Sequence, residues 1–448
     1  MEKRIFYKPK LNFLPENLDM DKWLSNTKLY DFKKFSRDDC SALISGLYTA
    51  PLYNKTLRVE NEGERPYYNL SSKIMYAQTK EYRRYIDLLI SSNIWESDNS
   101  YQKDKKSKGY RFTEEYHNQP CKKYLNFEDG RIAEKAEEAI AEEVLDGGET
   151  KTVQKLVNTL PSIKINYNDA IERLHKEYVD GTMTTSQRNC AYCAIEKINN
   201  GEFFAKQDDY GRLHTNLTNL KKEYRNYLKV ENGAKLVSID LKNSQPFFST
   251  LLFDSNFWEN KNVGGKLNLR DINSNLSKDI KHLDSIIMFT KSVAHNVDVS
   301  MYIDLVVNGT LYEFFLQRLI DEGVKVKNRA DAKKKIFMVF FSKLLHLENS
   351  KSASVFKRLF PSVYELFCLI KQKEHNTLAV LLQAIESNLF IEKVPCKYWE
   401  KTADSPIYTI HDSFLLPVEN LEILKEEMII SLVESVGYMP SVEIEHLN

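Results

Sequence analysis

Residues 408–417 read YTIHDSFLLP, so that a His-Asp-Ser triplet stands between two apolar runs. Short runs of this kind predict two β-strands that pair as a hairpin. The triplet contains neither glycine nor proline. We therefore expect the hairpin to hold Asp412 at a rigid turn, with His411 beside it.

A second strand is predicted to end in an aspartate. Residues 235–252 read KLVSIDLKNSQPFFSTLL, where the apolar run closes on Asp240 and Asn243 is a candidate N-cap for a helix reaching Leu251. A carboxylate at the end of a strand is well placed to hold a cation. The alternative is an ordinary strand-end or capping residue.

A third stretch, residues 328–345, reads NRADAKKKIFMVFFSKLL. Two cations and two aromatics recur in it at every fourth position and share one helical face: Arg329, Lys333, Phe337 and Phe341. This order suits a nucleoside triphosphate, with phosphates at the cationic end and the base against phenylalanine. The alternative is an amphipathic helix with cations near one end.

Asp240 and Asp412 lie on different predicted strands, with few other acids beside them. Two such carboxylates are the minimum for a two-metal site that activates a 3′-hydroxyl and stabilises leaving pyrophosphate. A third acid is not essential, because Mg²⁺ is commonly held by one or two carboxylates plus substrate phosphates.

In this order, the three stretches resemble motifs A, B and C of the family A DNA polymerases and the related phage-type single-subunit RNA polymerases. Motif A is a strand-end aspartate, here Asp240. Motif B is R-x3-K-x3-[FY]-x3-[YF], which residues 329–341 match. Motif C is His-Asp between apolar residues, here His411 and Asp412.

Three shorter stretches add to the resemblance, which covers about residues 205–420. GRLHTNLTNLKKEYRNYL, from Gly211, resembles the segment that meets the primer–template, with Arg212 at its arginine. LLQAIESNLF, from Leu381, resembles the helix before motif C, whose glutamine (here Gln383) faces the duplex. NGTLYEFF, residues 308–315, resembles the stretch between motifs A and B.

The resemblance implies a role for each matched position. Asp240, Asp412 and the carbonyl of Leu241 are implied to hold two Mg²⁺ ions. Arg329 and Lys333 are implied to bind the triphosphate, and Lys333 also to protonate the leaving pyrophosphate.

The remaining implied roles concern the base and the primer. Phe337 and Phe341 are implied to pack on the incoming nucleotide. His411 is implied to approach the primer end, while Arg212 and Gln383 bind primer and template.

Three positions depart from the family's usual pattern. Motif C of the DNA polymerases usually continues with glutamate, whereas Ser413 is what the RNA polymerases tend to carry. Ser342 stands where glycine often follows motif B. Gln245 occupies the sugar-selecting position, where DNA polymerases have glutamate and RNA polymerases glycine. Its bulk favours deoxynucleotides, and Ser413 favours the opposite.

We expect an α+β fold with the right-hand organisation of a polymerase. Its core is predicted over residues 205–448, with a palm at 205–260 and 391–448 and fingers at 261–390. Residues 131–204 turn helical in composition and are predicted to form a linker or a reduced thumb.

Residues 1–130 are predicted to form a mainly helical accessory region, too short for the usual proofreading domain. Within it, residues 81–112 read as an amphipathic helix, a strand, a Lys-rich turn and a second strand. This order is typical of a winged helix, and a solvated hairpin is the alternative. A module that contacts DNA, RNA or protein is expected here.

Composition narrows the class of protein. The 448 residues carry 63 Lys plus Arg and 63 Asp plus Glu, so net charge gives no global attraction to nucleic acid or membrane. No apolar run reaches transmembrane length, and the six cysteines are scattered, which predicts a reduced, cytoplasmic protein without a membrane partner. Cys190 and Cys193 predict helix-face thiols rather than a zinc site. No Gly-rich dinucleotide or phosphate loop is present.

The sequence thus predicts a nucleotidyltransferase, a compact DNA polymerase without proofreading that extends a primer on a template from dNTPs with two Mg²⁺ ions. An RNA polymerase or primase on the same scaffold is the alternative, and a non-catalytic nucleic-acid-binding relative is a second. So small an enzyme suits a mobile element or a phage. The sequence indicates no particular protein partner.

Overall fold

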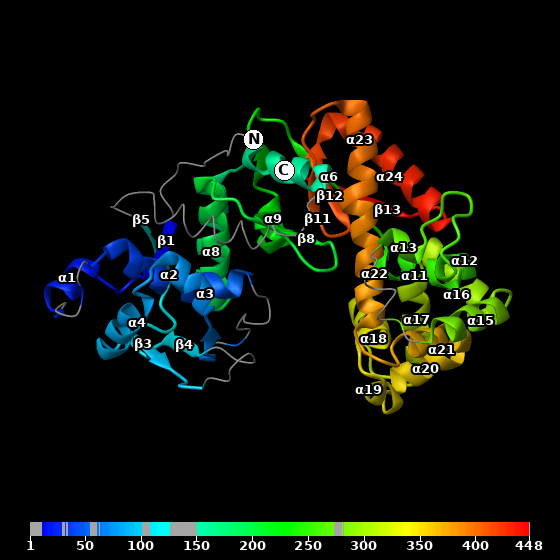
Figure 1. Ribbon diagram of the computed structural model, residues 1–448, viewed down its shortest axis with the longest axis horizontal. Coiled ribbons are helices and arrows are strands. Elements are labelled where there is room, and N and C mark those ends of the chain that lie inside the picture. The colour runs from blue at the N-terminus through cyan, green and yellow to red at the C-terminus, as the bar shows by residue number, and fades with distance from the viewer. Residues whose placement is uncertain are drawn as a thin grey trace.

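The structure is a computed structural model that describes residues 11–28, 32, 35–53, 61, 63–100, 108–125, 150–272, 280 and 282–447. Figure 1 shows the N-terminal elements on one side of helix α8 (Thr185–Asn200) and the long C-terminal helices on the other. The helical composition at 131–145 and the lysines at 103–106 lie outside the described residues.

The described residues of the N-terminal region form four helices and two small antiparallel sheets, of strand order β1-β5 and β2-β4-β3. Its elements are β1 (Leu11–Pro15), α1 (Met20–Ser25), α2 (Arg37–Tyr53), β2 (Tyr68–Asn69), α3 (Ser72–Gln78), α4 (Tyr82–Ser91), β3 (Trp95–Ser97), β4 (Gly109–Phe112) and β5 (Cys121–Leu125). The helix, strand and second strand predicted within residues 81–112 are present as α4, β3 and β4.

From residue 150 the described middle of the chain consists of helices with short strands between them. The elements are α6 (Lys151–Thr159), η2 (Leu160–Ser162), β6 (Ile163–Ile165), α7 (Tyr167–Val179), α8, β7 (Ala205–Gln207), β8 (Leu213–Thr215), α9 (Asn216–Asn219), α10 (Lys222–Arg225) and β9 (Leu228–Val230). A capping box at Thr184 begins α8, and Gly201 in the left-handed region ends it.

The C-terminal half is mostly helical around one four-stranded sheet. Its first elements, up to residue 370, are β10 (Leu236–Leu241), α11 (Ser244–Ser249), η3 (Thr250–Phe253), α12 (Ser255–Trp258), α13 (Leu269–Ile272), α15 (Leu283–Val293), α16 (Val297–Val307), α17 (Leu311–Asp321), α18 (Arg329–Phe341), α19 (Leu344–Glu348), α20 (Lys351–Leu359) and α21 (Pro361–Ile370). They continue with α22 (Thr377–Ser387), the π-helix η4 (Asn388–Lys393), α23 (Val394–Thr402), β11 (Tyr408–Ile410), β12 (Ser413–Pro417), η5 (Val418–Asn420), α24 (Leu421–Val436) and β13 (Val442–His446).

The central sheet has the strand order β11-β12-β10-β13, and every neighbouring pair is antiparallel. Strand β10 therefore has a partner on each side, although β12 comes more than 170 residues later and β13 more than 200. Its apolar side chains are buried, as expected for a central strand.

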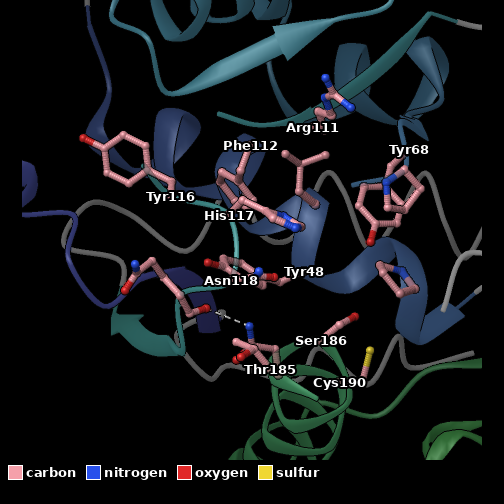
Figure 2. A pocket seen from close by; sticks show the side chains of 15 residues that line it. Tyr48, Tyr68, Arg111, Phe112, Tyr116, His117, Asn118, Thr185, Ser186 and Cys190 are labelled. Atoms are coloured by element: carbon pink, nitrogen blue, oxygen red, sulfur yellow. Dashed lines mark hydrogen bonds between the residues drawn. The ribbon is translucent and has the colours of Figure 1, made fainter. Parts of the chain in front are cut away.

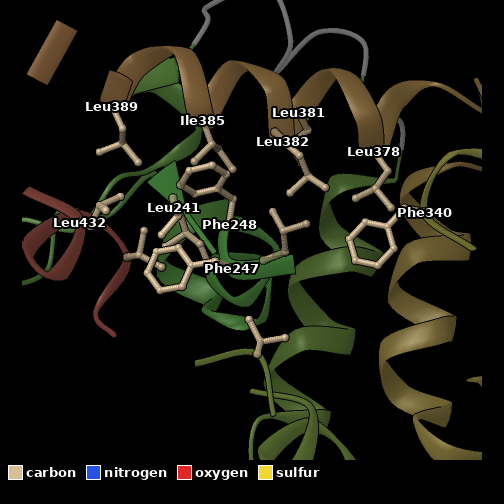
Figure 3. Packing of buried hydrophobic residues seen from close by; sticks show 14 of the residues in the cluster. Leu241, Phe247, Phe248, Phe340, Leu378, Leu381, Leu382, Ile385, Leu389 and Leu432 are labelled. Atoms are coloured by element: carbon tan, nitrogen blue, oxygen red, sulfur yellow. The ribbon is translucent and has the colours of Figure 1, made fainter. Parts of the chain in front are cut away.

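One face of this sheet is covered by helices, and Figure 3 shows the packing. Helix α22 lies across α11, so that Ile385 and Leu381 contact the cluster containing Phe247 and Phe248. Leu241 at the end of β10 belongs to the same core. Burial of such side chains contributes about 1.5–3 kcal/mol each, so α22 is held firmly against the sheet.

A second core joins the N-terminal region to the sheet. Helix α2 packs on α8, and the same cluster includes Tyr408 and Leu415 of the hairpin strands. Figure 2 shows where α2, β4 and α8 meet, around a cavity of about 60 Å³. This cavity has room for a few waters but not for a nucleotide.

Within the described ranges, every helix is too short or too polar to cross a membrane.

Candidate active site

The hairpin at 408–417 has a two-residue turn made of His411 and Asp412. Ile410 lies opposite Ser413 in the β11–β12 pair, and the Ser413 hydroxyl donates to the Ile410 carbonyl at 2.9 Å. His411 has a φ of 58°, whereas Asp412 is not in the left-handed region, which is the φ pattern of a type II′ turn. A non-glycine residue in that conformation costs about 1–2 kcal/mol. The turn therefore presents Asp412 through a strained but well-anchored backbone.

Asp240 is held next to this turn by the strand pairing. It lies opposite Ser413 on β12 and opposite Glu443 on β13. The Leu241 amide donates to the Asp412 carbonyl at 3.2 Å, which ties the two strand ends together. The two predicted aspartates thus meet because of backbone register. The Leu241 carbonyl as a ligand stays a prediction.

The helix expected after Asp240 is present as α11, but its cap differs from the expectation. Asn243 is the N-cap residue with a φ of 54°, and its side chain makes no capping hydrogen bond. The left-handed conformation, which asparagine tolerates, turns the chain sharply from β10 into α11. Asn243 therefore acts through its backbone here.

Both aspartates line one cleft of about 190 Å³, together with His411 and the cations Lys222 and Arg225 of α10. Its volume suits ions and phosphate groups rather than a whole nucleotide. Sequence reasoning missed Lys222 and Arg225, although both lie in the GRLHTNLTNLKKEYRNYL segment. The repeated cations within KKEYR could have signalled them.

The electrostatics of the cleft favour a bound cation. Burial, and then the charge of Asp412, raise the pKa of Asp240 to about 7, while Lys333 opposes the shift and Glu443 adds to it. Burial lowers the pKa of Arg225, against the opposing effect of Asp240. An ionised Asp240 beside Asp412 is costly without a counter-charge.

The donor set fits Mg²⁺, a hard cation that prefers carboxylate, carbonyl and water oxygens. Across the described ranges, no three His, Cys, Asp or Glu side chains gather in a way that could hold a metal ion. Any Mg²⁺ here would therefore depend on Asp240 and Asp412 together with backbone, water or substrate oxygens.

Helix α18 carries the predicted stripe of two cations and two aromatics. The Asn328 side chain accepts from the Asp331 amide and starts the helix. Ile336 and Phe340 face the core, and the exposed Arg329 and Lys333 lie off that buried face. The helix is therefore amphipathic and also presents two exposed cations.

Both cations of the stripe lie over the ring of Tyr312. The Arg329 guanidinium is 5.0 Å from the ring centroid and the Lys333 ammonium 5.8 Å. Arg329 also pairs with Glu313, and Lys333 lies 5.3 Å from the Phe337 ring. Tyr312 and Glu313, in NGTLYEFF, were not singled out from the sequence.

At the aromatic end of the stripe, the neighbouring rings contact one another. The rings of Phe337 and Phe341 are 5.4 Å apart, and Phe337 is 6.4 Å from Tyr312. Both phenylalanines are only partly buried, so each leaves part of a ring accessible.

Gln245 is joined to Arg212 through a residue that sequence reasoning missed, Glu386. The Gln245 amide donates to one oxygen of Glu386, and Arg212 donates to the other at 2.8 Å. Glu386 is 2% exposed, and burial raises its pKa to about 7. An acid inside the apolar LLQAIESNLF helix is the signal that could have found it.

Two residues predicted from the sequence remain to be placed, Gln383 and His411. Gln383 is partly buried on α22, the helix that carries Glu386. His411 lines both the larger cleft and a small cavity beside Arg212 and Glu386. The His411 ring is 6.3 Å from that of His214.

Asp412 is the point on which these groups converge. Burial is the main cause that raises the pKa of Asp240, of Tyr312 and of Glu386, and the charge of Asp412 adds to it at all three. Lys333 acts on the same Asp240 carboxyl. The Gln245–Glu386–Arg212 network adjoins the strand ends, since His411 lines one cavity with Arg212 and Glu386 and another with the two aspartates.

No protein-family model and no curated protein matches this chain. Among solved structures, the chain is similar to the POL domain of Pol1 from M. smegmatis in complex with DNA primer-template and dNTP, with a TM-score of 0.36 and 11% sequence identity. The match covers 70% of this chain and 73% of that one. A DNA polymerase domain is thus a weak structural neighbour, too distant to decide what this chain does.

Proposed function

We propose that this protein is a template-directed nucleotidyltransferase, a compact DNA polymerase of the family A type that extends a 3′-hydroxyl from dNTPs. The observation that carries the proposal is the meeting of Asp240 and Asp412 in one cleft beside Lys333. The matches to motifs A, B and C in the sequence support the same activity.

In this proposal, the two strand ends hold the reacting phosphate. Asp240, Asp412 and the Leu241 carbonyl would hold two Mg²⁺ ions, which supply activation of the 3′-hydroxyl and stabilisation of the leaving pyrophosphate. The strained His411–Asp412 turn fixes one carboxylate, and the pairing of β10 with β12 fixes the other. Both are pre-positioned, so little reorganisation accompanies binding.

The cations and aromatics of α18 would bind the incoming nucleotide. Arg329 and Lys333 would contact the triphosphate, and Lys333 would donate a proton to the departing pyrophosphate. Phe337 and Phe341 would pack on the base, since each leaves part of its ring accessible.

The same proposal assigns contacts to the nucleic acid. His411 would approach the primer end, while Arg212 and Gln383 would bind primer and template. Arg225 and Lys222 supply further positive charge at the cleft.

The parts of the chain are proposed to follow the right-hand plan. The palm would comprise residues 205–260 and 391–448, the fingers 261–390 and a reduced thumb 131–204. All six cysteines are free thiols, which supports a reducing compartment such as the cytoplasm.

Two residues favour different sugars. Gln245 is 8% exposed and held by Glu386, so its bulk is fixed where it would oppose a 2′-hydroxyl. Ser413, in place of the usual glutamate, instead favours an RNA polymerase or primase. We assign deoxynucleotides, because a fixed side chain at the sugar acts directly on its selection.

Primer extension on primed and unprimed templates, with separate dNTP and rNTP pools, tests the proposal. We expect template-directed incorporation of dNTPs that requires Mg²⁺, and rNTP use that rises when Gln245→Gly opens the sugar position. Strong ribonucleotide incorporation that Gln245→Gly leaves unchanged would instead establish the RNA polymerase alternative. Incorporation by neither pool would support a non-catalytic nucleic-acid-binding protein.

A further inference from the structure

Residues 37–112 form a unit that the proposed catalytic site does not use. In chain order it contains α2, β2, α3, α4, β3 and β4, and its sheet has the order β2-β4-β3. The last two strands pair with Trp95 opposite Phe112 and so form a hairpin directly after α4. Three helices followed by such a hairpin are the arrangement of a winged helix, in which the third helix enters a DNA groove.

Helix α4 has one buried face and one exposed face. Tyr85, Leu88 and Leu89 are buried against α2 and β3, and the Tyr85 hydroxyl accepts from the Ser36 amide. The exposed residues of the helix are Arg83, Arg84, Asp87, Ile90 and Ser91. Two arginines thus lie in its first turn, the part of a recognition helix that reaches DNA.

The charge of this unit differs from that of the whole chain. Residues 37–112 contain thirteen Lys and Arg and ten Asp and Glu, while the complete sequence is balanced. Glu96 pairs with Arg65 and Arg111, and Arg84 pairs with Glu81. Arg83 and Arg84 of α4 and Lys108 next to β4 are exposed cations of this unit.

A cleft of about 530 Å³ is lined by residues of α3, α4 and both hairpin strands. Arg83 and Asp87 line it from the helix and Lys108 from the hairpin, so that one acid opposes the two cations. A phosphodiester strand running along this cleft would meet a cation on each side.

We propose that residues 37–112 bind duplex DNA through the exposed face of α4, separately from the nucleotidyl-transfer site. Figure 1 shows α4, β3 and β4 on the opposite side of α8 from α18 and α22. DNA rather than RNA is the partner, because the major groove of B-DNA admits an α-helix whereas that of A-form RNA is deep and narrow.

The packing of α2 on α8 and the contacts around the small cavity in Figure 2 fix this unit to the rest of the chain. It would therefore hold a duplex in a set orientation relative to the catalytic sheet. The inference does not depend on the proposed catalytic function.

Binding of the full chain to a closed dumbbell DNA of about two helical turns tests this inference, since the DNA offers no 3′ end to the catalytic cleft. We expect the double variant Arg83→Ala with Arg84→Ala to bind the DNA roughly tenfold more weakly. The magnitude of the slope of log K against log salt should fall by about 1.8, because each lost phosphate contact reduces that slope by about 0.9. The matched control is Lys261→Ala with Lys291→Ala, which removes two exposed cations on the far side of the molecule and should change neither quantity.

Wild-type affinity and salt slope in the Arg83/Arg84 variant would overturn the inference. Equal losses in both double variants would also overturn it, because they would show a diffuse charge effect. Tighter binding of an RNA hairpin of equal length would replace the DNA assignment. If no nucleotide is incorporated but the Arg83/Arg84 variant loses binding as expected, the proposed catalytic function fails and this inference stands.

Discussion

The strand ends and helix α18 position their functional groups in different ways. Asp240 and Asp412 are placed by backbone register and by a strained turn, in a cleft where burial raises the pKa of Asp240. Arg329 and Lys333 are exposed and held by contacts with Glu313 and with the Tyr312 ring. The carboxylates are therefore held by the backbone, whereas the cations have weak side-chain partners that they could exchange for the triphosphate of the proposed substrate.

The largest effect on activity is expected at the two aspartates of the strand ends. Asp412→Asn or Asp240→Asn should reduce nucleotide incorporation by at least about 10³-fold, because each removes a charge on which the proposed metal site depends. Thermal unfolding supplies a second readout, since Mg²⁺ should raise the Tm of the wild type but of neither variant.

A matched control for these variants is Asp404→Asn, which alters a carboxylate that is 92% exposed and pairs with Lys155. It should leave incorporation and the Mg²⁺-dependent rise in Tm unchanged. Full activity in Asp412→Asn would show that the strand ends do not form the active site.

The next largest effect is expected at the cationic stripe. Lys333→Ala should lower kcat/KM for the incoming nucleotide by about 10²-fold, because it removes the proposed triphosphate contact and proton donor. Lys334→Ala, the exposed neighbour off the stripe, should stay within a few-fold of wild type. Steady-state incorporation kinetics measure both, and equal losses would mean that the stripe has no special role.

A pH-dependent effect is expected at the Gln245–Glu386–Arg212 network, which lies beside the strand ends. Burial raises the pKa of Glu386 from 4.5 to about 7, so the folded protein holds a proton there that the unfolded chain releases. The stabilisation is complete below about pH 4.5 and is lost as pH rises through 7. Relative to Glu386→Gln, the wild-type free energy of unfolding should fall by up to about 3 kcal/mol between pH 5 and pH 8.

Urea unfolding of both proteins across that pH range provides the measurement. Glu434→Gln, at an exposed carboxylate that pairs with Lys397, is the control and should follow the wild type. A difference between wild type and Glu386→Gln that does not change with pH would contradict the buried, proton-holding state of Glu386.

The smallest effect is expected at the partner of Arg329. Glu313→Gln removes a half-exposed ion pair, and such pairs contribute about 0.2–1 kcal/mol. Tm should therefore stay nearly constant, while KM for the nucleotide falls slightly because Arg329 no longer has to leave a carboxylate. A large loss of stability would mean that the cations are as rigidly held as the aspartates.

Several parts of the candidate site could be predicted from short stretches of the sequence. The turn at His411–Asp412, the strand that ends near Asp240 and the four-residue spacing in α18 all follow from short-range patterns, since hairpins and helices repeat over a few residues. The order α4, β3, β4 is readable for the same reason.

Tertiary structure alone decided which distant groups meet. Glu386 joins Arg212 and Gln245, which are 174 and 141 positions away, and β10 lies between two strands from the end of the chain. Strand order and the partners of a buried polar group depend on how whole elements pack, and no local period encodes that packing. The sequence thus determined the separate parts of the site, and the fold determined that Asp412 lies where they converge.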